Sequence, residues 1–358
     1  MTSPVQVFHP ESDSRYLIYA EGLFGRTTSK TANMLIRYIP ERVACVVDSR
    51  CGGKKVREVI SNLPGDIPVV ADIDAGMQYD PTHLVVGVAP TGGQLPEAWR
   101  DPLKHAITQG LHLVSGLHTF LTEDDEFRSL AAQHSVTLID LRKPPVITEI
   151  SQGLWRERTI PVVLTVGPDS AVGKLTAAWE FKRQLEQRGY TVGLAATGQT
   201  GILLNGEGIV VDAVRGDFIS AATELLIESQ LERGPDVVLV EGQGSIYHEA
   251  FSAVTLGILH GAMPDALLFS HRPSRRANVY GFTFPPYRQM INDYEAIIER
   301  YKPTRTLGIQ IDTSEYDQNI AGSLCEEIQN ITGLPTVDFV RNGESPGVEQ
   351  IIHNLRLA

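Results

Sequence analysis

Short runs of apolar residues alternate with amphipathic segments along nearly the whole chain. In the first half the apolar runs lie at 16–20, 43–47, 67–70, 83–88, 111–115 and 136–140. Segments with apolar residues at helical spacing lie between them, at 31–38, 96–109 and 123–133. Strands that alternate with helices form parallel sheets, because a parallel neighbour is reached only through a long crossover connection. The pattern therefore predicts a doubly wound α/β domain of Rossmann-like type.

The second half repeats this alternation. We expect strands at 161–164, 190–196, 237–240, 266–270 and 306–312. We expect helices at 175–188, 219–232, 290–301 and 318–332, and a loop at 341–343. Residues 141–145 end in two prolines, which interrupt regular structure and stiffen a linker. With 358 residues the chain is long enough for two domains, which we assign to 1–150 and 151–358.

The stretch 165–179, with the sequence TVGPDSAVGKLTAAW, stands between a predicted strand and a predicted helix. A glycine-rich turn and then Gly-Lys at a helix start is the layout of a phosphate-binding loop. Helix N-terminal N–H groups attract an anion, and a lysine adds a mobile positive charge. The second domain is therefore predicted to be P-loop NTPase-like. Its predicted cofactor-binding residues are Gly167, Asp169, Ser170, Ala171, Val172, Gly173, Lys174, Leu175 and Thr176.

The spacing of this loop departs from the usual pattern. Five residues rather than four separate Gly167 from Gly173, and Leu175 stands where the magnesium-binding Ser or Thr belongs. Thr176 follows one position later, which is a rotation of about 100° on a helix. We therefore expect phosphate binding without ordinary magnesium-ATP hydrolysis, and we assign no metal ligand. The alternative is a glycine-rich turn with an exposed lysine.

The run 237–240 delivers Glu241 to the carboxyl end of a predicted strand. Ligands of parallel sheets bind beyond these ends, where an acid can act as a base or hold a metal through water. Glu241 is therefore the first candidate for a catalytic base, and His248 is the second. A surface or capping role is the common alternative for a lone histidine. Lys174 is the third predicted catalytic residue, because it can stabilise negative charge.

Several other polar residues follow predicted strands. The arginines at 272, 275 and 276 suit carboxylate or phosphate groups, because guanidinium pairs with two oxygens. The alternative for the arginines is a solvated basic loop. The polar residues of 197–201 could instead belong to a glycine turn, and Asp217 could be only a helix N-cap. Asp312 and Thr313 are weaker candidates for contacting a nucleotide base. The predicted substrate-binding residues are Thr197, Gln199, Thr200, Asp217, Gln243, Ser245, Arg272, Arg275 and Arg276.

In the first half, Gly22 and Gly25 with Asp48 resemble part of a dinucleotide site. The glycine spacing is incomplete, so we favour a Rossmann-like scaffold without a cofactor over an NAD site. The hydroxyl-rich run 25–31 could form an anion cradle, but we favour a helix N-cap.

Composition narrows the function classes. A net charge of −12 gives no electrostatic footprint for nucleic acid, and three cysteines do not make a disulfide framework. We see no signal peptide and no apolar run long enough to span a bilayer. The expectation is a cytoplasmic protein with a small-molecule substrate and with neither nucleic-acid nor membrane partners. A homodimer would suit a two-domain metabolic enzyme, although no residue pattern supports it.

Two motifs resemble dethiobiotin synthetase: GPDSAVGK in the loop and VEGQGS at 240–245. Adding GLP at 333–335 and RNG at 341–343, the whole chain is more similar to a family long described as a domain of unknown function. That family, now often labelled D-glutamate N-acetyltransferase-like, joins a Rossmann-like domain to a P-loop domain. The resemblance implies transfer of an acetyl group from acetyl-CoA to an amino acid such as D-glutamate.

The phosphates of acetyl-CoA could occupy the loop without a catalytic metal, which fits the displaced Thr176. Glu241 or His248 would then take the proton of the amine, and the three arginines would bind the carboxylates of the acceptor. Two alternatives remain open. One is an ATP-dependent ligase of dethiobiotin-synthetase type, with ATP and magnesium. The other is a non-catalytic nucleotide-binding regulatory protein.

Overall fold

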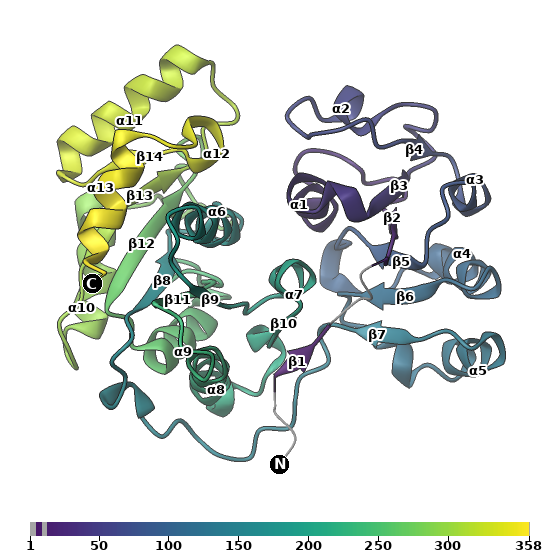
Figure 1. The fold of residues 1–358 in the computed structure, drawn as a ribbon, viewed down its shortest axis with the longest axis horizontal. Helices are drawn as coiled ribbons and strands as arrows, with labels where there is room; N and C mark the ends of the chain where they lie inside the picture. Colours follow the sequence, from purple (N-terminus) through teal and green to yellow (C-terminus); the bar gives the residue numbers. More distant parts are fainter. Residues whose placement is uncertain (1–4, 9–12, 358) are drawn as a thin grey trace. The chain divides into compact units, whose positions relative to one another are not determined.

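The computed structural model describes residues 5–8 and 13–357, which form two compact units (Figure 1). Of the described residues, the N-terminal unit comprises 6–8, 13–143 and 202–210, and the C-terminal unit comprises Val5, 144–201 and 211–357. In the described residues no helix is both long and apolar enough to cross a membrane.

The N-terminal unit is built on a parallel sheet in the order β4-β3-β2-β5-β6-β7. Its strands are β2 (Tyr16–Tyr19), β3 (Val43–Val47), β4 (Val69–Val70), β5 (His83–Val86), β6 (His112–Ser115) and β7 (Leu138–Asp140). Its helices are α1 (Lys30–Tyr38), α2 (Val56–Val59), α3 (Ile73–Met77), α4 (Glu97–Thr108) and α5 (Asp125–His134). A separate antiparallel pair joins β1 (Gln6–Val7) to β10 (Glu207–Gly208). The strand order reverses between β2 and β5, so the predicted Rossmann-like topology is confirmed.

Asp48, directly after β3, serves as an internal link in this unit. Its buried carboxylate accepts hydrogen bonds from the backbone N–H of Phe24 at 2.8 Å and from Arg50 at 3.0 Å. Burial acts to raise the pKa of Asp48, but the bonds from Arg50 and Phe24 leave that pKa below its usual value. Ser29 is the N-cap residue of α1, yet its hydroxyl bonds Gly25 and the Asn33 side chain rather than a backbone N–H of the helix. Both groups hold the loop after β2.

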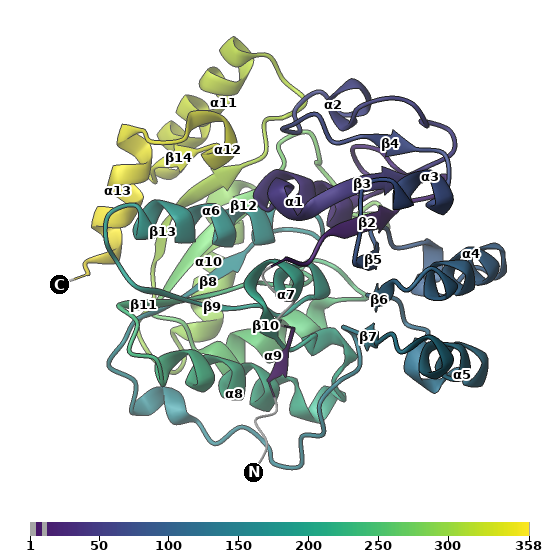
Figure 2. The same cartoon turned by 45° about the vertical axis from the view of Figure 1, so that its right-hand side comes forward.

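The C-terminal unit contains a second parallel sheet, in the order β14-β13-β12-β8-β11-β9 (Figures 1 and 2). Its strands are β8 (Val162–Val166), β9 (Val192–Ala195), β11 (Val237–Val240), β12 (Ala266–His271), β13 (Thr306–Ile311) and β14 (Thr336–Val337). Its helices are α6 (Lys174–Glu186), α8 (Ile219–Leu231), α9 (Ser252–Ala262), α10 (Tyr287–Ile298), α11 (Gln318–Thr332), α12 (Phe339–Asn342) and α13 (Pro346–Leu355). A further helix, α7 (Gln199–Asn205), begins in this unit and ends in the other. Two doubly wound parallel-sheet domains were predicted, and this prediction is confirmed.

The central strands are buried on both faces, as parallel strands covered by helices are. Side chains of α6, α12 and α13 share one hydrophobic cluster with β8, β11, β12 and β13. The helices α8 and α9 pack against each other and against β11 and β8. The central strand β8 is thereby fixed between helical layers, and its carboxyl end opens onto the loop 167–173.

The structure also contains elements that the hydrophobic pattern did not predict. The segment 341–343 was expected to be a loop, but Arg341 and Asn342 belong to α12 because the Asp338 carboxylate caps that helix. The helix α9 contains Gly257 and Gly261, which are poor helix formers. Gly261 is required there because a Cβ would lie 2.3 Å from a backbone oxygen of α8. Close packing between helices therefore overrides propensity.

Two glycine substitutions should change the stability of the C-terminal unit in opposite directions. A Cβ on Gly242 would lie 1.8 Å from the carbonyl oxygen of Thr165, whereas one on Gly322 in α11 meets nothing within 4 Å. We expect Gly242→Ala to lower the free energy of unfolding by about 3 kcal/mol, because backbone must move. We expect Gly322→Ala to raise it by about 0.5–1 kcal/mol, because Gly is costly in an exposed helix. Urea unfolding of both variants checks this, and equal effects would contradict it.

Candidate functional site

The loop 167–173 joins β8 to α6 at the point where the sheet order reverses, with β11 on one side of β8 and β12 on the other. Gly167 approaches β12 so closely that a Cβ would lie 2.2 Å from the carbonyl oxygen of Ser270. Gly173 is the N-cap of α6 with a φ of 101°, and no side chain caps the helix there. An N-terminus without a side-chain cap is suited to an anion.

The loop is supported from below by side chains on distant elements. The Ser270 hydroxyl donates to the carbonyl of Val172 at 3.0 Å. The Tyr294 hydroxyl, on α10, donates to the carbonyl of Gly167 at 2.7 Å and accepts from the N–H of Ile246 at 3.2 Å. Burial raises the pKa of Tyr294 to about 12, so this hydroxyl keeps its proton at physiological pH. The sequence showed no signal for either support, because both lie about a hundred residues or more after the loop.

The phosphate loop contains a buried acid, Asp169, and several basic side chains lie next to it. The Asp169 carboxylate accepts from Arg275 Nη1 at 3.1 Å and from the N–H of Ser170 at 2.7 Å. Its other contact is with Nε2 of His248, 3.9 Å away. Lys174 is buried and donates to the carbonyl of Asp169 at 2.6 Å. The loops after β8, β11 and β12 therefore meet at one carboxylate.

His248 is buried between aromatic rings at the edge of this cluster. Its ring stacks on Phe251 with a centroid distance of 4.3 Å, and Tyr280 contacts it edge-on at 5.4 Å. Nδ1 accepts a long hydrogen bond from the N–H of Ala250 at 3.3 Å. Nε2 faces Asp169, so the imidazole has a carboxylate on one nitrogen and a weakly engaged lone pair on the other.

Glu241 follows β11 and is also buried. Its carboxylate accepts from the N–H groups of Thr197 and Gly198, each at 3.2 Å, and from the Gln243 amide at 2.9 Å. The Thr197 hydroxyl donates to the carbonyl of Glu241 at 2.6 Å. These contacts hold the turn before α7, so the acid has an evident structural task.

The three arginines point to different partners. Arg275 contacts the phosphate loop through Asp169. Arg272 instead donates to Asp312 at 2.9 and 2.6 Å, and Arg276 is exposed. The structure therefore does not bring them together as one clamp. Burial acts to raise the pKa of Asp312, but Ser314 and Arg272 leave that pKa below its usual value.

The remaining predicted residues are distributed as follows. Asp217 is exposed in a short turn, and Phe218 rather than Asp217 is the N-cap of α8. Thr313 is buried and bonds Asp338, so it helps to hold α12. Gln199 and Thr200 begin α7, and Ser245 accepts from the N–H of Tyr247. In the phosphate loop and α6, Ala171 has a φ of 54°, Val172 and Leu175 are buried, and Thr176 is half-buried.

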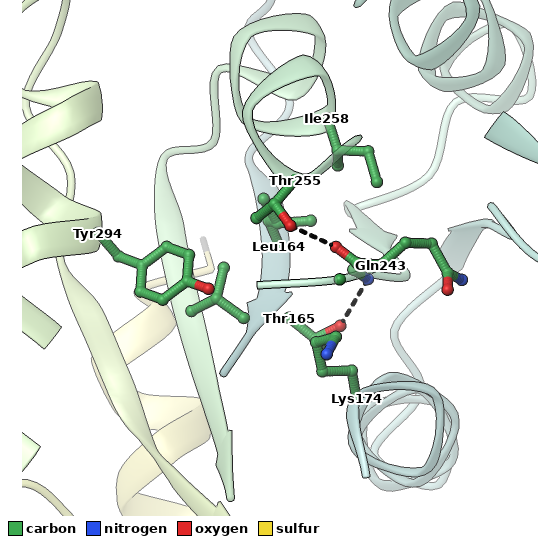
Figure 3. A pocket seen from close by; sticks show the side chains of 10 residues that line it. Leu164, Thr165, Lys174, Gln243, Thr255, Ile258 and Tyr294 are labelled. Atoms are coloured by element: carbon green, nitrogen blue, oxygen red, sulfur yellow. Dashed lines mark hydrogen bonds between the residues drawn. The ribbon is translucent and has the colours of Figure 1, made fainter. Parts of the chain in front are cut away.

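A small cavity lies behind the loop (Figure 3). Its lining residues are Leu164, Thr165, Val166, Lys174, Gly242, Gln243, Gly244, Thr255, Ile258 and Tyr294. It has no room for a molecule the size of water. Two hydrogen bonds beside it, Gly242 N–H to Thr165 at 2.9 Å and Thr255 to the carbonyl of Gln243 at 2.8 Å, join the surrounding segments (Figure 3). These bonds and the close packing around the cavity hold the segments after β8 and β11 against each other.

A parallel sheet whose central strand leads into a glycine-rich turn, a helix without a side-chain cap and Lys174 defines a P-loop protein. The chain belongs to the DUF1611 family. Residues 149–348 match the model "Domain of unknown function (DUF1611_C) P-loop domain", and residues 49–144 match "Domain of unknown function (DUF1611_N) Rossmann-like domain". The family and the two domain types that the sequence motifs predicted are confirmed.

Relatives extend this similarity over most of the chain. A protein named D-glutamate N-acetyltransferase from Pseudoalteromonas sp is 36% identical over 276 residues, which is 76% of this chain and 80% of that one. One of the same name from Tritonibacter scottomollicae is 34% identical over 263 residues, 73% of this chain and 78% of that one. The crystal structure of a DUF1611 family protein from Anabaena variabilis ATCC 29413 matches with a TM-score of 0.89 and 32% identity, and covers 95% of this chain and 99% of that one.

His271, at the end of β12, shapes the turn that carries Arg275. Nε2 lies 3.0 Å from the carbonyl of Arg275 and must donate to it, so Nδ1 accepts from the Tyr287 hydroxyl at 2.7 Å. The neutral ring matches both partners. Burial lowers the pKa of His271 to about 4.

This histidine should make the stability of the C-terminal unit pH-dependent. Between the unfolded pKa of about 6.5 and the folded value of about 4, the unfolded chain binds the extra proton, so stability falls as pH falls. From pH 7 to pH 5 we expect a loss of roughly 2 kcal/mol from this residue, measured by urea unfolding. His271→Gln keeps an amide donor but does not titrate. The free energy of unfolding of this variant should therefore fall by roughly 2 kcal/mol less than that of the unaltered protein between pH 7 and pH 5. An unchanged pH dependence in this variant would contradict the assignment.

Proposed function

We propose that the C-terminal unit is an N-acetyltransferase that moves the acetyl group of acetyl-CoA to the amine of an amino acid such as D-glutamate. The observation that carries this proposal is the buried pair of His248 and Asp169 at the edge of a phosphate loop with Leu175 after its lysine. Such a pair suits proton transfer, and the loop suits a phosphate-bearing donor. The two curated relatives that carry the name D-glutamate N-acetyltransferase support the same reaction.

The residues of the loop fit the phosphates of coenzyme A. The N-terminus of α6 has no side-chain cap, and Lys174 and Arg275 bring two positive charges to the loop. Leu175 is buried and has no oxygen to offer a metal, and acyl transfer requires none at this position. Gly167 and Gly173 let the backbone follow a bound anion closely.

Acetyl-CoA supplies a thioester, which an amine converts into an amide as the C–N bond forms and the C–S bond breaks, and the leaving sulfur takes up the amine proton through the base, so that the thiol is released. His248 accepts the proton of the amine at Nδ1, where the bond from Ala250 is long. The Asp169 carboxylate lies 3.9 Å from Nε2, beyond hydrogen-bond distance, and its negative charge stabilises the imidazolium that forms. Lys174 and the backbone N–H groups of 243–245 stabilise the negative charge that develops on the carbonyl oxygen.

The contacts of Glu241 and the exposure of Arg276 indicate which residue is the base and which one binds the acceptor. Both oxygens of Glu241 already accept hydrogen bonds that hold the turn before α7, so His248 is the better base. Arg276 is exposed, which leaves its guanidinium accessible to a carboxylate of the acceptor.

The competing function is an ATP-dependent ligase that activates a carboxylate. It is favoured by the position of Glu241 directly after β11, where P-loop enzymes use an acid together with magnesium. A regulatory protein that binds a nucleotide without turnover is the non-catalytic alternative. Which ligand binds the phosphate loop distinguishes the acetyltransferase from the ligase. The presence or absence of turnover distinguishes both enzymes from the regulatory protein.

A thermal-shift titration with acetyl-CoA, ATP alone and ATP with magnesium tests the proposed ligand. At equal ligand concentrations we expect acetyl-CoA to stabilise the protein more than ATP with or without magnesium does, and by about 2.7 kcal/mol once its concentration reaches a hundred times its dissociation constant. Thiol release with D- and L-amino acids then identifies the acceptor. Stabilisation by magnesium-ATP alone, with release of ADP, would favour the ligase instead. Binding of either ligand with no turnover would favour the regulatory alternative.

Variants of the two base candidates should behave differently. His248→Gln should lower kcat by about a hundredfold or more while the thermal shift with acetyl-CoA is kept, because proton transfer is lost. Glu241→Gln places an amide NH₂ against N–H donors, so it should lower the free energy of unfolding by about 1–3 kcal/mol. An active His248→Gln enzyme beside a stable but inactive Glu241→Gln enzyme would reverse the two roles.

A further inference from the structure

An exposed apolar surface adjoins the site and has no task in the mechanism above. It consists of four large side chains, here called the aromatic rim: Phe251 (46% exposed), Val279 (74%), Tyr280 (64%) and Phe282 (43%). Phe251 and Tyr280 contact the His248 ring, and Phe282 stacks on Tyr247 at a centroid distance of 6.1 Å. Large apolar groups gathered at a surface mark a binding site more often than scattered ones do.

The chain holds this rim in place with a dedicated network. Residues 277–283 form a small hairpin, in which Ala277 pairs with Thr283 and Gly281 turns with a φ of 86°. The buried Asn278 amide donates to the carbonyl of Tyr247 at 3.0 Å and to Glu249 at 2.7 Å. Its oxygen accepts from the N–H groups of Tyr280 and Phe282 at 2.9 and 3.1 Å. All four hydrogen-bonding positions of the side chain are used, so the rim is a built feature rather than a loose loop.

The rim is continuous with the phosphate loop. Arg275 lies on that loop, through bonds to Asp169 and to the carbonyl of Ser170 at 2.8 Å, and Tyr280, five residues later, lies against His248. The stretch 277–284 has no formally charged side chain, in a protein with a net charge of −12. One short segment therefore leads from a cationic anchor for an anion to an apolar surface beside the proposed base.

We propose that the aromatic rim packs against the uncharged arm of an acyl thioester whose phosphates lie on the phosphate loop, and so brings the thioester to His248. This inference rests on the proposed function, because it names the part of the donor that the hairpin recognises. A donor with phosphates at one end and an uncharged arm with methyl and methylene groups at the other matches the arrangement of the site. The rim contributes apolar contact area, whereas Lys174 and Arg275 contribute charge.

A pair of ligands that differ only in the arm tests this directly. ADP and dephospho-coenzyme A share the nucleoside diphosphate, and only the second carries the arm. In calorimetric titrations, Tyr280→Ala and Phe251→Ala should each weaken dephospho-coenzyme A binding by about tenfold and change ADP binding by less than about twofold, since a lost ring removes apolar contact only. The acetyl-CoA KM should rise in parallel. Ile331→Ala, at an equally exposed position on α11, should change none of these values.

Three outcomes would overturn the inference, and they are distinguishable. Equal losses for ADP and dephospho-coenzyme A would show that the hairpin supports the phosphate loop and does not hold the arm. Unchanged affinities with a changed sedimentation mass would show that the rim covers a second copy of the chain. Failure of the unaltered protein to bind coenzyme A, with ADP or ATP bound normally, would remove the proposed function as well.

Discussion

The candidate site depends on one buried charge, the carboxylate of Asp169 in the phosphate loop. A buried carboxylate is costly unless it is paired and hydrogen-bonded, and here Arg275 and the N–H of Ser170 meet that requirement. His248 completes the arrangement from a third loop. Because each partner comes after a different strand, the acid draws the loops after β8, β11 and β12 together. The proposed base, the anion cradle and the aromatic rim are all positioned relative to this group.

The loops after β8 and β11 meet at the site because their backbones lie very close to neighbouring strands of the sheet. Gly167 lies against the backbone of β12, and Gly242 lies against the backbone of β8, with no room for a Cβ in either case. Tyr294 and Ser270 then fill the space beneath the loop and fix its carbonyl groups. The candidate catalytic groups thus follow strands of the sheet, and side chains beneath the phosphate loop hold its shape. Such fixed positions suit the proposed proton transfer.

Much of the fold could be predicted from the sequence, because its signals are local. Apolar runs of strand length identified every strand of the two large sheets except β14. Helical periodicity identified most of the long helices. The glycine-rich turn before Lys174 identified the phosphate loop, and VEGQGS identified the segment after β11. Several elements were missed, including α13, although Ser345 caps it and Pro346 begins it, as is typical of a helix start. The helix α9 carries two glycines that close packing requires, and α12 depends on a cap from Asp338.

The sequence by itself determined the two α/β domains, the phosphate loop and the residues at the carboxyl ends of the strands. The tertiary structure alone decided which of those residues meet. Arg272 and Arg275 are three positions apart, yet one pairs with Asp312 and the other with Asp169. Glu241 turns toward the start of α7, while His248 turns toward the phosphate loop. The reason is that strand order in a parallel sheet, which is set by long-range packing, determines which loops become neighbours.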